Sequence, residues 1–179
     1  QDKYHCEAIK LAERRIKLPS ALTNTRLRCL SVCLVLQLLK FEEILEEYPQ
    51  IQVIIDLHRD GVAENRHLMK EVQGIPMAQF MFFNGLSYVN TKGPIDYLPN
   101  PNLSGNLALS YQATVIANEY YPGMTRRTYL NGYRYNMHYR DKTMLIELGA
   151  QTNTVDEIMS ACEPLAHVLD MVFSGEEKG

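Results

Sequence analysis

The stretch IQVIIDLHRDG, residues 51–61, decides the fold class. Its first eight residues are rich in β-branched side chains and show no alternation of apolar and polar residues. Such a run is typical of a strand buried on both faces of a parallel sheet. A short helix is predicted just before it, where FEEILEEY (residues 41–48) is closed by Pro49.

Further strands are predicted downstream. TMLIEL, residues 143–148, is a second buried strand, and TRRTYL, residues 125–130, is a short one. Two extended runs surround the turn at Gln73-Gly74, and residues 77–83 form the more buried of them. The Asn-, Gly- and Pro-rich residues 84–102 are expected to form a long functional loop.

Helices alternate with these strands. One follows the long loop and ends at Pro122, and the last begins at Thr154, which makes a capping box with Glu157. We therefore expect one domain with an α/β layered fold, in which a central, mostly parallel sheet is flanked by helices. Ligands are expected at the carboxyl ends of its strands.

Composition excludes several classes of protein. A formal net charge of −3 argues against a nucleic-acid-binding surface, and 46% hydrophobic residues are enough for a sizeable core. The longest apolar run, residues 29–39, is too short to span a bilayer. The four cysteines contain no C-x-x-C pair, so a cysteine zinc cage is not expected.

His58, Arg59, Asp60 and Asn65 have the spacing of a protein-kinase catalytic loop. The partners of that loop are missing, because the chain contains no G-x-G-x-x-G and no D-F-G after Asn65. A kinase is therefore excluded.

His58 and Glu147 end the two buried strands and are the main candidates for chemistry. An ionisable carboxylate in an apolar strand is costly to bury unless it is paired or catalytic. Imidazole suits zinc, and a carboxylate with a raised pKa suits acid–base catalysis on a bound water. The alternative is a structural, hydrogen-bonded histidine, and a catalytic zinc usually takes three protein ligands.

A polar loop precedes the second buried strand and contains Arg134, Asn136 and His138. These side chains are either a solvated loop or a group that binds a carboxylate or an amide carbonyl.

Five motifs occur in order and at consistent spacing, and together they resemble the stage II sporulation protein P family, peptidoglycan hydrolases of endospore-forming bacteria. The motifs are VIIDLHRDG (53–61), LPNPNLSGNLALS (98–110), YYPGMTRR (120–127), GYRYNMHYR (132–140) and MLIELGAQTNT (144–154).

The resemblance implies a zinc-dependent N-acetylmuramoyl-L-alanine amidase, with an endopeptidase activity also attributed to the family. It implies that His58 is a zinc ligand and that Glu147 is the catalytic acid/base. It places Arg134 and Asn106 near the substrate. It further implies a membrane-anchored protein that acts outside the mother-cell membrane during engulfment, with a lytic transglycosylase and a membrane scaffold protein as partners.

Residues 1–40 depart from the family pattern. The expected Y-H-T-H-x-x-E segment, which supplies the other zinc ligands, is reduced to YHCE (4–7), with His5 and Glu7 as possible replacements. We see no clear strand in residues 1–40 and expect the fold to lack its first strand. Either the chain begins after the first ligand motif or residues 1–40 come from a shifted reading frame. The domain boundaries are therefore 1–40, an atypical segment, and 41–179, the amidase-like domain. A catalytically impaired module that binds peptidoglycan or sporulation partners without cleavage is the alternative function.

Overall fold

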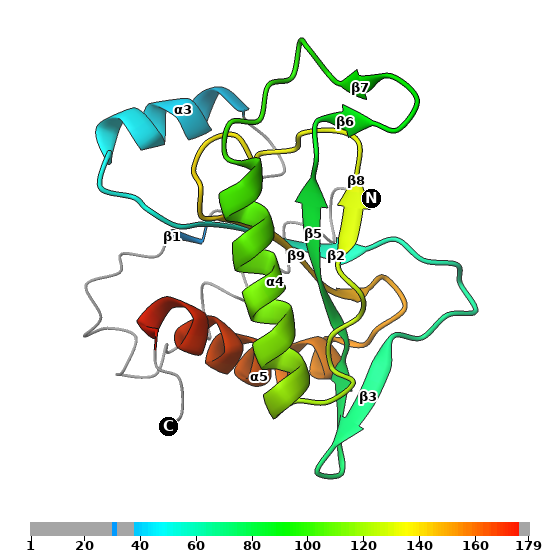
Figure 1. Ribbon diagram of the computed structural model, residues 1–179. Helices are drawn as coiled ribbons and strands as arrows, with labels where there is room; N and C mark the ends of the chain where they lie inside the picture. Colours follow the sequence, from blue (N-terminus) through cyan, green and yellow to red (C-terminus); the bar gives the residue numbers. More distant parts are fainter. Residues whose placement is uncertain (1–29, 32–37, 176–179) are drawn as a thin grey trace.

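The structure, a computed structural model, describes residues 30–31 and 38–175 (Figure 1). Its helices are α3 (Leu38–Glu47), α4 (Leu103–Tyr120) and α5 (Val155–Ser174). The strands of the main sheet are β1 (Leu30–Ser31), β2 (Ile54–Asp60), β5 (Phe80–Gly85), β8 (Tyr129–Asn131) and β9 (Thr143–Ala150). Two small hairpins are formed by β3 (Met69–Val72) with β4 (Ile75–Ala78), and by β6 (Tyr88–Val89) with β7 (Gly93–Pro94).

The main sheet has the strand order β1-β2-β9-β5-β8. The pairs β1–β2, β2–β9 and β5–β8 are parallel, and β5–β9 is antiparallel. The predicted α/β class and the central, mostly parallel sheet are therefore confirmed. None of the helices in the described ranges is both long and apolar enough to cross a membrane.

Two predicted strands need correction, and one strand was not predicted. β1 is a two-residue strand in a segment where none was expected. The predicted strand 77–83 is divided at Gln79 between β4, which pairs with β3, and β5, which pairs with β9. The predicted strand 125–130 is shifted to β8, and Thr125 makes only an isolated bridge to Phe80. The predicted zinc-ligand replacements His5 and Glu7 lie outside the described residues.

One face of the sheet is covered by α4 and α5, as Figure 1 shows. This side is close-packed, because Ala113 and Ala117 of α4 and Ala161 of α5 are fully buried and let the helices approach the strands. Its strand residues are Ile55, Phe80, Phe82, Met144, Ile146 and Leu148.

The opposite face carries the polar residues. Since side chains alternate along a strand, Ile54, Asp56 and His58 of β2 all lie on this face. Ile54 packs beside Leu45 of α3, so α3 covers the face only near the start of β2. α3 does not cover the carboxyl-terminal halves of β2 and β9, which carry the candidate active-site residues.

The hairpin turn between β3 and β4 supports a prediction about stability. Gln73 and Gly74 form a two-residue turn with φ of 52° and 79°, the type I′ geometry that favours Asn-Gly. Gln73→Asn is expected to stabilise the fold by roughly 0.5–1 kcal/mol, because asparagine tolerates a positive φ better than glutamine. Urea unfolding would measure the change. Gln52→Asn, at an exposed position outside any turn, is the control and should leave stability unchanged.

Candidate active site

His58 and Glu147 lie side by side on the polar face of the sheet. They are direct partners in the register between the parallel strands β2 and β9. Glu147 is also opposite Met81 on its other neighbour, β5. The structure therefore brings together the two residues predicted to carry the chemistry, although they are far apart in the sequence.

Asp56 holds the ring of His58. Its Oδ1 lies 2.6 Å from Nε2 of His58, and its Oδ2 accepts a hydrogen bond of 3.1 Å from Nδ2 of Asn136. The side chain of Asp56 is almost fully buried. The hydrogen bond to Asp56 raises the pKa of His58 although burial opposes it. Metal-bound histidines commonly donate one ring nitrogen to a carboxylate in this way.

Glu147 is held in an environment that favours its protonated form. Burial raises the pKa of Glu147, and the charge of His58 opposes this only in part. Its Oε2 is buried and has no hydrogen-bond partner. Most buried polar atoms are paired, so an unpaired carboxylate oxygen indicates a group that interacts with something besides the protein.

An ion pair lies beside Glu147. Arg126, in the segment before β8, donates to Oδ2 of Asp60 at 2.5 Å and contacts Sδ of Met81 at 3.0 Å. Asp60 follows a bulge in β2 immediately after His58, and Met81 is the β5 partner of Glu147. The guanidinium therefore lies next to Glu147, whose pKa its charge lowers after the larger effects of burial and His58.

The two predicted substrate-binding residues have different positions. Arg134 is half-buried in the polar loop, and its Nη1 donates to the carbonyl of Pro99 at 3.2 Å. Asn106, in α4, is only 1% exposed. Its Nδ2 donates to the carbonyl of Met137, and its Oδ1 accepts from the N–H of Thr143. Asn106 therefore fixes the polar loop and the start of β9 from beneath.

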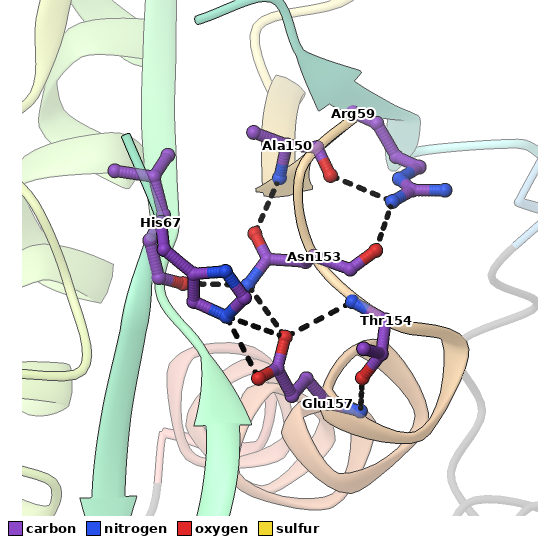
Figure 2. A network of polar contacts seen from close by, with 7 residues as sticks. Arg59, His67, Ala150, Asn153, Thr154 and Glu157 are labelled. Atoms are coloured by element: carbon purple, nitrogen blue, oxygen red, sulfur yellow. Dashed lines mark hydrogen bonds and ion pairs between the residues drawn. The ribbon is translucent and has the colours of Figure 1, made fainter. Parts of the chain in front are cut away.

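The turn after β9 is fixed by a hydrogen-bond network centred on Asn153 (Figure 2). The side chain of Asn153 accepts from the N–H of Ala150 and donates to Leu68 and to Glu157. Arg59 donates to the carbonyls of Ala150 and Asn153. The confirmed capping box of α5 completes the network. These contacts join the ends of β2 and β9 to α5, so the motif around Asn153 holds the frame of the site.

The donor atoms meet one requirement of a zinc site and fall short of another. His58 is oriented by a carboxylate, as zinc-bound imidazoles are. A catalytic zinc usually takes three protein ligands, whereas the described residues contain no group of three histidine, cysteine or acidic side chains suited to a metal.

Asp56 and Arg126 contribute to the site, and the sequence alone predicts a role for neither of them. The i, i+2 spacing of Asp56 and His58 on one strand was the available signal. Nothing local in the sequence indicates the contact of Arg126 with Asp60, which is set by the chain path between β5 and β8.

Fold and site together define a mixed α/β domain with an imidazole and a half-buried carboxylate in register in the carboxyl-terminal halves of adjacent parallel strands, a combination suited to hydrolysis. Residues 38–170 match the family model described as Stage II sporulation protein P (SpoIIP), and the chain belongs to this family. Membership implies a peptidoglycan-hydrolase role in a sporulating bacterium. A search of curated proteins gives no match.

Proposed function

We propose that the chain is a zinc-dependent amidase that cleaves the bond between N-acetylmuramic acid and L-alanine in peptidoglycan. The observation that carries the proposal is Glu147, a carboxylate with a raised pKa and an unpaired buried oxygen, in register with His58. Family membership supports the substrate. We place its action outside the mother-cell membrane during engulfment, with a lytic transglycosylase and a membrane scaffold protein as partners.

The residues of the site divide the chemistry between them. Zinc, when bound, lowers the pKa of a water molecule and polarises a carbonyl group. Asp56 keeps the ring of His58 in one orientation, and His58 would hold the metal. Glu147 accepts the proton of the attacking water and returns it to the departing amine of L-alanine. Arg134 is proposed to contact the substrate from the polar loop, and Asn106 to hold that loop in place.

Digestion of purified peptidoglycan tests the reaction. The full chain, supplied with zinc, is expected to release stem peptides with new L-alanine amino termini, without new reducing ends. New reducing ends would instead indicate glycan cleavage. Intact peptidoglycan with no new termini would contradict an amidase.

Removal of His58 is expected to abolish zinc binding. His58→Ala should lose stoichiometric metal, and Asp56→Ala should weaken zinc binding by about 10–100-fold, because the anchoring carboxylate orients the ligand. Metal analysis after dialysis at defined free zinc would measure both. The matched control is His167→Ala on α5, whose ring contacts Tyr121 on the helical side of the fold. Equal zinc retention in His58→Ala and His167→Ala would refute the assignment.

A second function is favoured by the incomplete ligand set among the described residues. In this case the chain is a catalytically impaired amidase fold that binds peptidoglycan or sporulation partners without cleavage. Co-sedimentation with cell-wall sacculi separates the two, since binding without release of stem peptides is the signature of the second.

A further inference from the structure

Three exposed tyrosines follow one another on and after β8, and we call them the tyrosine shelf: Tyr129, Tyr133 and Tyr135. Their exposed fractions are 49%, 62% and 40%. Tyr129 is the register partner of Phe83 on β5, and Phe83 is in turn the partner of Leu145 on β9. Leu145 lies two residues before Glu147, so Tyr129 is on the same face of the sheet as the candidate catalytic carboxylate.

Buried aromatic contacts support the shelf from below. The ring of Phe83 lies 4.6 Å from that of Tyr135, edge-on at 77°, and 5.1 Å from that of Tyr129. The hydroxyl of Tyr135 also interacts electrostatically with Glu147. Burial raises the pKa of this hydroxyl, and the charges of Tyr129 and Glu147 raise it further. β8 is two strands away from β9, and Tyr129 is level with Leu145, two residues before Glu147, so the Cα atoms of Tyr129 and Glu147 are roughly 12 Å apart.

The backbone of the shelf is strained and fixed. Tyr135 has φ of 52°, a left-handed conformation that costs roughly 1–2 kcal/mol for a side chain of this kind. The loop lies directly on β5 at Gly85, where a Cβ atom would be 2.5 Å from the carbonyl oxygens of Tyr133 and Arg134. The surrounding contacts therefore impose a conformation that tyrosine does not prefer, which is a common property of functional sites.

The chemistry of the shelf fits a sugar better than a peptide. Tyrosine rings offer an apolar face and a hydroxyl, which match the C–H faces and hydroxyl groups of a pyranose. A stem peptide carries carboxylates that call for cationic partners. The guanidinium of Arg134, between Tyr133 and Tyr135 in the chain, donates to the carbonyl of Pro99 and is the nearby cation for such a carboxylate. The shelf itself consists of neutral side chains.

We infer that the tyrosine shelf is a binding subsite for sugar rings of the glycan strand next to the scissile amide. This inference rests on the proposed function, because it takes the glycan of peptidoglycan as the substrate. It assigns to the shelf the task of placing the strand so that the lactyl amide reaches Glu147.

The test is a binding experiment that requires no cleavage. A soluble β-1,4-linked N-acetylglucosamine tetrasaccharide is titrated into the full chain carrying Glu147→Gln, with ligand-observed NMR as the readout. Tyr133→Ala and Tyr129→Ala are each expected to weaken binding about tenfold, and Tyr133→Phe, which keeps the ring, by much less. The control is Tyr111→Ala in α4, since Tyr111 is 71% exposed on the helical side of the fold.

Several outcomes would overturn the inference. Equal affinity of Tyr133→Ala and Tyr111→Ala would do so, and so would binding of a free stem tetrapeptide in place of the tetrasaccharide. A dimer that Tyr133→Ala dissociates in sedimentation would assign the shelf to a second copy of the chain. Far-ultraviolet circular dichroism checks that each variant is folded. If Tyr129→Ala is unfolded, the comparison of Tyr133→Ala with Tyr133→Phe still tests the inference.

The inference and the proposed function fail in different ways. Suppose that tetrasaccharide binding depends on the shelf but the wild-type chain releases no stem peptides. This result would support the sugar subsite and refute the amidase activity. If Tyr133→Ala instead releases stem peptides with an unchanged KM, the amidase activity is supported and the sugar subsite is refuted.

Discussion

Glu147→Gln is expected to reduce release of stem peptides from purified peptidoglycan by about 10²–10⁴-fold, the usual contribution of a positioned general acid–base group. Glutamine has nearly the same shape but cannot carry a proton between water and a leaving amine. Zinc content should be unchanged, because His58 remains anchored on Asp56. The rate is measured as new L-alanine amino termini, and Glu119→Gln, at an exposed position of α4, is the control.

The same substitution should leave the fold at least as stable as the wild type. Burial raises the pKa of Glu147 in the folded protein, so the folded state prefers the protonated carboxyl group and loses stability as pH rises through that pKa. At neutral pH a neutral glutamine avoids this loss. A large drop in unfolding free energy would show that the carboxylate is structural, and an unchanged rate would remove Glu147 from the mechanism.

The pH dependence of the wild-type rate follows from the same raised pKa. The base must be ionised to accept a proton, so activity is expected to fall on acidification at a pH above the ordinary range for glutamate. A profile of kcat/KM against pH would show this limb. An acid limb at the ordinary glutamate pKa would contradict the environment described for Glu147.

Asn106→Ala is expected to destabilise the protein by about 2–5 kcal/mol. The substitution leaves two buried backbone groups without partners, the carbonyl of Met137 and the N–H of Thr143, and each unpaired group costs about 1–3 kcal/mol. Chemical denaturation would measure the loss. The matched control is Asn118→Ala, an exposed asparagine of the same helix that donates to Thr114. Similar stabilities for the two variants would refute the role of Asn106 as a clamp.

Local chemistry in the sequence was sufficient to predict much of the fold. The β-branched run around Ile55 and the apolar run before Glu147 gave β2 and β9, and Thr154 with Glu157 gave the start of α5. Each of these signals acts within a few residues. The two-residue strand β1 was not predicted, because it is defined by its pairing with β2, which is distant in the sequence.

The candidate site was predicted only in part, for a related reason. Periodicity placed His58 and Glu147 at strand ends, but the register that aligns them depends on how β9 enters the sheet. The burial of Asn106 and the left-handed backbone of Tyr135 depend on the loop from Tyr133 to Met137 folding back onto β5. Such a long-range contact cannot be predicted from a local sequence pattern.

The position of β9 has a consequence for the order of assembly. This strand comes late in the chain, yet it lies in the middle of the sheet and joins β2 to β5. Until β9 has been synthesised, β2 and β5 each present an unpaired edge, and the two halves of the sheet have no common strand. A nascent chain that ends before Thr143 therefore has neither a closed sheet nor Glu147. His58 and Glu147 therefore come together only after most of the chain has been synthesised.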